Sequence, residues 1–239
     1  MRPLSASNVR RWPETDAELE RLQTELARQA LEVEPWSFPR DRPIMVAGAF
    51  IAYRTGVYGM GERGDRAWVA AAVFEGPART ASATLEGSVG APYIAGYLAL
   101  REGPLLERVV RELILPPEVL LVDATGRDHP RRAGLAVHLG AVLDLPSVGV
   151  TDRALLAIGD KPGRLRGARA PLRIGDELVG YALRTCDGVR PVLVHAGWRT
   201  LPETACEVVL AATGPMRTPE PLREARRLAK DVRSRSQID

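Results

Sequence analysis

The sequence is poor in cysteine and lysine. Its 239 residues include two cysteines, Cys186 and Cys206, and no CxxC spacing. This excludes a disulfide framework and argues against a structural zinc site, so we expect both to be small buried side chains. Lys161 and Lys230 are the only lysines, which leaves 33 − 2 = 31 arginines. Arginine suits two-point phosphate contacts, although a GC-rich coding sequence would give the same bias. The net charge of +3 permits nucleic-acid binding without requiring it.

Long hydrophobic runs are also missing. Gly, Pro or charged residues interrupt every apolar stretch before the roughly 20 residues that a membrane span needs. The first residues, MRPLSASNVRRWPETD, lack the apolar core of a signal peptide. We therefore expect a cytoplasmic protein without a membrane partner. The length, with 45% hydrophobic and 26% charged residues, is typical of a single globular domain over residues 1–239, with frayed termini.

Apolar patterns predict the elements of the N-terminal half. Thr15–Val33 carries leucines at helical spacing behind a capping threonine, which predicts a helix. Ile44–Tyr53 is almost wholly apolar and is typical of a central strand. Ala67–Phe74 and Arg79–Leu85 are predicted as its antiparallel neighbours, after a turn-rich connection at Gly56–Asp65.

In the rest of the chain, strand and helix patterns alternate. Arg164–Arg173 is rich in Gly and Arg and is predicted as a loop. This alternation indicates an α/β fold with a mixed central sheet flanked by helices. The predicted strands are Val119–Val122, Ser147–Val150, Leu178–Arg184 and Pro191–Val194, and the predicted helices lie within Gly90–Leu115 and at Arg131–Leu143, Pro202–Ala212 and Leu222–Val232.

The stretch VLLVDATGRDHPRR, residues 119–132, concentrates the chemistry. A buried strand ends in Asp123, and His129, Arg131 and Arg132 follow within nine residues. Ligands of open α/β sheets gather at the carboxyl ends of such strands, so we expect these four side chains to face one crevice. An acid beside basic groups suits a metal ion that holds a phosphate.

Four segments together resemble the endonuclease V family. They are PYIAGYLALRE (Pro92–Glu102), VDATGRDHPRRAGLAVHLG (Val122–Gly140), LPSVGV (Leu145–Val150) and RTPEPLREA (Arg217–Ala225), in the family's order and spacing. The similarity spans about residues 15–230. It implies a ribonuclease-H-like core and a DNA repair nuclease. Such an enzyme nicks the second phosphodiester bond 3′ to deoxyinosine with Mg²⁺, or Mn²⁺, as cofactor, and acts as a monomer on DNA and in some cases RNA.

The resemblance also implies roles for individual residues. Glu102 and Asp123 match two of the family's three metal carboxylates, and His129 matches a histidine beside the scissile phosphate. Tyr93 matches a ring that wedges into the duplex, and Gly126 would line the pocket for a flipped base. Arg131 and Arg132 lie where phosphate contacts are expected. From the residues alone, Tyr93 would be a buried loop anchor and His129 an ordinary turn residue.

Four positions depart from the family's pattern. Phe50 occupies the place of the first-strand carboxylate, and no acid lies between Asp41 and Glu62. Ala124 replaces a glycine and Trp198 replaces a histidine, while Asp152 replaces a lysine and becomes a candidate substitute metal ligand. The departures leave two interpretations open: a magnesium-dependent endonuclease with a rearranged site, or a catalytically impaired homologue that binds nucleic acid without cleaving it.

Overall fold

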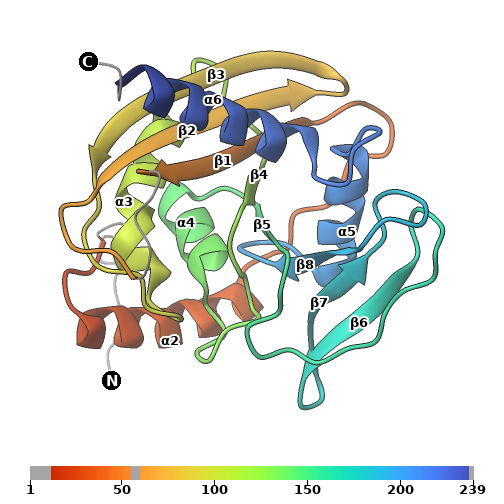
Figure 1. The fold of residues 1–239 in the computed structure, drawn as a ribbon. Coiled ribbons are helices and arrows are strands. Elements are labelled where there is room, and N and C mark those ends of the chain that lie inside the picture. The colour runs from red at the N-terminus through yellow and green to blue at the C-terminus, as the bar shows by residue number, and fades with distance from the viewer. Residues whose placement is uncertain (1–11, 55–59, 237–239) are drawn as a thin grey trace.

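The computed structural model describes residues 12–54 and 60–236, so part of the connection predicted at Gly56–Asp65 and the termini predicted to fray lie outside the described residues. These residues form one eight-stranded mixed sheet in the order β3-β2-β1-β4-β5-β8-β7-β6 (Figure 1). The strands are β1 (Met45–Tyr53), β2 (Arg66–Glu75), β3 (Ala78–Ser88), β4 (Val119–Val122), β5 (Ser147–Thr151), β6 (Arg169–Ile174), β7 (Glu177–Leu183) and β8 (Val192–Ala196).

Helices cover both faces of the sheet. In Figure 1, α6 lies along β1 and β2 on one face, where α5 packs against β7 and β8, while α3 and α4 pack on the opposite face and α2 lies outside them. The helices are α2 (Asp16–Glu32), α3 (Leu98–Arg111), α4 (Leu135–Leu143), α5 (Pro202–Ala211) and α6 (Glu220–Ser236). The predicted α/β class is therefore confirmed, and none of the described helices is long and apolar enough to cross a membrane.

Strand alternation divides the core into two layers. In β1, Ala47 and Ala49 face the cluster beneath α3 and α4, whereas Val46 joins the cluster beneath α5 and the start of α6. In β4, Leu120 and Val122 face the first cluster, and Val119 and Leu121 face the second. Because side chains alternate along a strand, this pattern also decides which face the residues at the strand ends point to.

Three sequence predictions about the fold were wrong. Arg79–Leu85 was predicted as a neighbour of the Ile44–Tyr53 strand, but β3 pairs with β2 and lies at the edge of the sheet. The segment predicted as a loop at Arg164–Arg173 contains most of β6, a strand at the edge of the sheet. In this strand Ala170 and Leu172 are buried, and Arg169, Pro171 and Arg173 are exposed. Its arginines and proline conceal that alternation. The helix predicted at Arg131–Leu143 begins only at Leu135, because Arg132 has a positive φ of 55° that a helix does not allow.

Candidate functional site

The parallel strands β1 and β4 bring Phe50 and Asp123 side by side. Ala49 pairs with Val122, so Phe50, within β1, lies beside Asp123, which directly follows β4. Gly48 allows α6 to approach this edge closely, because a Cβ atom at Gly48 would lie 2.3 Å from the backbone of Pro221. The close approach places the first turns of α6 over the middle of β1, next to β4.

Arg226 of α6 occupies the space beside these two residues. Its Nη2 atom donates a hydrogen bond to Asp123 Oδ2 at 3.0 Å, and its guanidinium lies 4.8 Å from the centre of the Phe50 ring. The Asp123 side chain is 37% exposed. Partial burial raises the pKa of Asp123, and the positive charge of the nearby Arg226 acts in the opposite direction. Asp123 therefore has a fixed positive partner supplied by the chain itself.

Glu102 approaches the same place from α3. It is 9% exposed and accepts a hydrogen bond of 2.6 Å from the Tyr53 hydroxyl at the end of β1. Burial raises the pKa of Glu102 to about 7, helped by the neighbouring charge of Asp123. A small cavity of about 90 Å³ is lined by Phe50, Glu102 and Asp123 together. The structure thus brings the two predicted carboxylates to one site.

The raised pKa of Glu102 predicts a stability that falls as the pH rises. The folded protein holds the proton of the Glu102 carboxyl more tightly than the unfolded chain does. This protonated carboxyl therefore contributes its full stabilisation of the fold below about pH 4.5, and the contribution is lost as the pH rises through about 7. Glu102→Gln should therefore be about 2–3 kcal/mol more stable than the natural protein at pH 8, with a small difference at pH 5. Thermal unfolding in EDTA at both pH values measures this. Glu112→Gln, at the exposed end of α3, is the control, and an equal difference at both pH values would contradict the assignment.

The donor set does not fit a divalent metal ion. Within residues 12–54 and 60–236, no three His, Cys, Asp or Glu side chains are grouped so that they could hold one. Phe50 contributes a ring where the family resemblance requires a carboxylate. Asp152, the candidate substitute, instead forms ion pairs with Arg217 at 2.5 Å and Arg190 at 3.2 Å.

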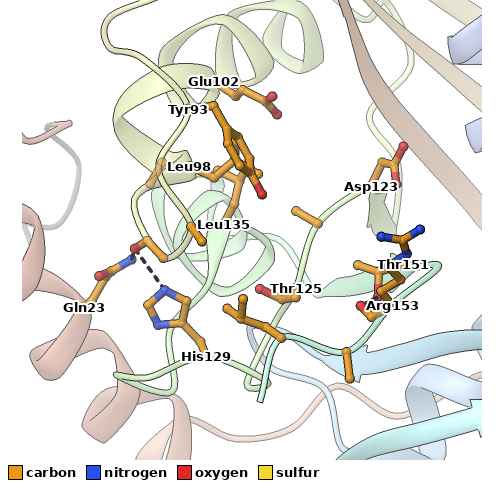
Figure 2. A pocket seen from close by; sticks show the side chains of 16 residues that line it. Gln23, Tyr93, Leu98, Glu102, Asp123, Thr125, His129, Leu135, Thr151 and Arg153 are labelled. Atoms are coloured by element: carbon orange, nitrogen blue, oxygen red, sulfur yellow. Dashed lines mark hydrogen bonds between the residues drawn. The ribbon is translucent and has the colours of Figure 1, made fainter. Parts of the chain in front are cut away.

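A larger cavity of about 450 Å³ opens beside the two carboxylates. Figure 2 shows Glu102 and Tyr93 on one side and Asp123, Thr151 and Arg153 on the other, with His129 and Gln23 at the opposite end. Tyr93 is 49% exposed and also borders a neighbouring cavity of about 520 Å³. The alternative of a buried loop anchor does not agree with this exposure, and the role of Tyr93 as a wedge stays a prediction.

His129 lines the cavity, but both of its ring nitrogens have partners. Nε2 lies 3.0 Å from the Gly96 carbonyl oxygen, to which it donates, and Nδ1 accepts from the Arg131 backbone N–H at 3.1 Å. Burial lowers the pKa of His129 to about 4, so the ring is neutral at physiological pH. These bonds tie the loop before α3 to the loop after β4. The predicted contact with a phosphate would require the bond to Gly96 to break.

Arg131 and Arg132 do not join Asp123 and His129 in the cavity wall. Arg131 donates to Gln23 Oε1 at 2.7 Å and stacks on the Tyr97 ring at 4.7 Å. Arg132 donates to Glu177 Oε2 at 2.7 Å. Both guanidinium groups therefore have partners within the fold, and their predicted phosphate contacts stay a prediction.

The remaining predicted positions serve the scaffold around the cavity. Gly126 does not line it; a Cβ atom there would lie 2.0 Å from the Ala196 carbonyl oxygen, so its lack of a side chain permits close contact with β8. Ala124 is buried and lines the cavity. Trp198 is buried among residues of α2 and α4, and Val137 is one of its neighbours.

Sequence reasoning missed three features of the site. Tyr53 and Arg226 hold the two carboxylates, and only Tyr53 had a sequence signal, as the last residue of an apolar strand. The third is Asp128, which is fully buried and accepts hydrogen bonds of 2.7–2.8 Å from the backbone N–H groups of three consecutive residues, Leu155 to Ala157. His195 lies 3.9 Å from this carboxylate and contacts Thr151 Oγ1 at 2.8 Å.

In this α/β fold Asp123, after a parallel strand, and Glu102, on α3, lie next to a cavity with an exposed aromatic ring, an arrangement that suits a nuclease-like fold. A sequence model of the endonuclease V family matches residues 33–227. The endonuclease V of Streptomyces avermitilis is 37% identical over 92% of this chain and 93% of its own length. That of Roseiflexus castenholzii is 42% identical over 72% of this chain and 79% of its own. The chain therefore belongs to the endonuclease V family.

Solved structures share the fold. A crystal structure of the Streptomyces avermitilis protein superposes with a TM-score of 0.83 at 36% identity and covers 95% of this chain and 96% of that one. The endonuclease V of Ciona intestinalis, crystallised with a 24mer DNA that contains an inosine, has the same fold at 22% identity, with a TM-score of 0.73 over 95% of this chain and 100% of that one.

Proposed function

We propose that this protein binds nucleic acid that carries a deaminated base and holds it without efficient cleavage. The single observation that carries the proposal is the contact of Arg226 with both Asp123 and Phe50. Endonuclease V nucleases are generally metal-dependent. By the family resemblance Phe50 replaces one of the three metal carboxylates, and the Arg226 guanidinium pairs with Asp123, one of the two that remain. Binding of this kind uses the basic surface, the cavity and the exposed Tyr93, and we expect it to be carried out by a monomer.

Deoxyinosine in DNA is the substrate base that we expect, with RNA as the alternative. The Ciona intestinalis relative was crystallised with inosine-containing DNA, which supports this choice. The cavity of about 450 Å³ lies beside Tyr93, which suits a base turned out of the duplex.

Cleavage 3′ to deoxyinosine is the second candidate function. It is favoured by one observation: Glu102 and Asp123, the two carboxylates that remain, line the same two cavities. The residues present do not complete a metal site, so we place this activity second.

A cleavage and gel-shift assay separates the two functions. Labelled duplexes with one deoxyinosine, and matched RNA with one inosine, are incubated with excess protein in Mg²⁺, Mn²⁺ or EDTA. We expect a shifted band and no nicked product. Metal-dependent nicking that disappears in Asp123→Ala would overturn the proposal in favour of the enzyme, and the ratio of DNA to RNA affinity gives the preferred nucleic acid.

Tyr93→Ala should weaken binding to the deoxyinosine duplex about tenfold to a hundredfold. A ring that replaces lost base stacking contributes about 1–3 kcal/mol. Tyr93→Phe keeps the ring and should bind like the natural protein. Fluorescence anisotropy measures both affinities, with an undamaged duplex as reference. A loss that is equal on both duplexes would mean that Tyr93 does not recognise the lesion.

A further inference from the structure

The ion pairs of the aspartates that follow β4 and β5 contain more positive than negative groups. Asp123 pairs with Arg226, and Asp152 pairs with Arg217 and Arg190, so three arginines face two aspartates, 3 − 2 = +1. Arg153 adds a further guanidinium to the cavity wall near Asp123 (Figure 2).

The position of Arg226 is determined from two sides. Asp123 binds one of its terminal nitrogens, and the Phe50 ring supports the plane of the guanidinium. Arginine has five N–H donors, and among the described residues Arg226 gives a hydrogen bond only to Asp123. The side chain is 43% exposed, so its remaining donors are accessible to an oxygen ligand.

Two further basic residues continue this face of α6. Lys230 and Arg233 follow Arg226 by four and seven residues, which places all three on one side of the helix. Arg233 Nη1 donates to the Tyr53 carbonyl oxygen at 2.9 Å, so this side of α6 lies over the end of β1. Lys230 is exposed. A row of cations suits a phosphate backbone.

We propose that Arg226 is a built-in cation that binds a phosphodiester of the nucleic acid, so that binding needs no metal ion. The inference rests on the proposed function and specifies its ligand and its chemistry. Asp123 and Phe50 hold the guanidinium, and its free N–H groups donate to the phosphate oxygens. A guanidinium that is already paired with Asp123 holds the phosphate and leaves that carboxylate unavailable for a divalent ion.

The first test is binding of a deoxyinosine duplex by fluorescence anisotropy. We expect equal affinity in Mg²⁺ and in EDTA. Arg226→Ala should bind tenfold or more weakly and lower the salt dependence of log Kd by about one unit. Arg226→Lys, which keeps the charge, should fall in between and guards against a loss caused by a changed fold. Arg227→Ala is the matched control, since Arg227 pairs with Glu224 and Asp231 on another side of α6; it should change affinity less than twofold.

The outcomes separate this inference from the function on which it rests. Binding without nicking that is unchanged in Arg226→Ala, or that is lost in EDTA, overturns the inference alone. If the natural protein does not bind the duplex, the proposed function fails, and a titration with inorganic phosphate decides the inference. A shift of the Arg226 Nε–H signal in the NMR spectrum with phosphate, absent in Arg226→Lys, supports it, and no shift overturns it.

Discussion

Replacing Phe50 by aspartate and Arg226 by alanine should create metal-dependent nicking of a deoxyinosine duplex, at least a hundredfold above the natural protein. The parallel register of β1 and β4 places residue 50 beside Asp123, so the new carboxylate joins Asp123 and Glu102. A carboxylate about 4 Å from a single positive charge contributes roughly 4 kcal/mol at an effective dielectric of 20, and each 1.36 kcal/mol corresponds to about tenfold in rate. Arg226 must be removed as well, because it otherwise neutralises Asp123.

The control for this experiment is the double variant Phe50→Asn with Arg226→Ala. It has nearly the same shape and lacks the charge, so it should remain inactive. Denaturing gels with Mg²⁺ and with EDTA give the cleavage rates, and isothermal titration with Mn²⁺ measures metal binding directly. If the aspartate variant binds Mn²⁺ no better than the asparagine variant, Phe50 is not the reason that the donor set is incomplete.

Asp128→Ala should lower the free energy of unfolding by about 3–5 kcal/mol. The change removes a fully buried carboxylate and leaves the N–H groups of Leu155, Leu156 and Ala157 without their acceptor. Each buried donor that loses its partner costs about 1–3 kcal/mol. In a protein of this size the melting temperature should fall by roughly 6–20 °C. Since Leu155 lines the cavity of about 450 Å³ beside Tyr93, binding of the deoxyinosine duplex should weaken as well.

Two further variants show whether the effect belongs to the buried contacts. Asp128→Asn keeps one acceptor oxygen and should lose less stability than the alanine variant. Asp152→Ala removes an aspartate that is 62% exposed and paired at the surface, and such pairs contribute about 0–1 kcal/mol. Thermal and denaturant unfolding compare all three. Equal losses in Asp128→Ala and Asp152→Ala would contradict the role of the backbone hydrogen bonds.

The sequence predicted most of the fold because its central strands are almost wholly apolar runs. Ile44–Tyr53 was expected as a central strand, and β1 occupies Met45–Tyr53 between β2 and β4. Of its two predicted antiparallel neighbours, β2 was confirmed, whereas β3 pairs with β2 at the edge of the sheet and not with β1. β6 was missed because an edge strand exposes polar side chains at alternate positions and therefore resembles a loop in composition.

The site was predictable only where residues lie close in the sequence or carry the family resemblance. Asp123 and His129 come from one short loop, and the structure places both in the cavity wall. Arg131 comes from the same loop, yet it turns away to α2, where Gln23 accepts its hydrogen bond. A position after a strand indicates where the backbone of a residue lies. The direction of a long side chain depends in addition on the partners that tertiary packing brings near it.

The sequence by itself determined the family, the α/β class and the substitution of a phenylalanine for an acid at position 50, since each is expressed in a local pattern. Only the tertiary structure decided which positive group pairs with Asp123 beside that phenylalanine. Arg226 is one of 31 arginines and lies 103 residues from Asp123 along the chain, so no local pattern distinguishes it. Its contact with Asp123 follows from the packing of α6 on β1 at Gly48, where the two backbones come close together. Charges that are distant in sequence interact only after such packing has brought them within a few ångströms.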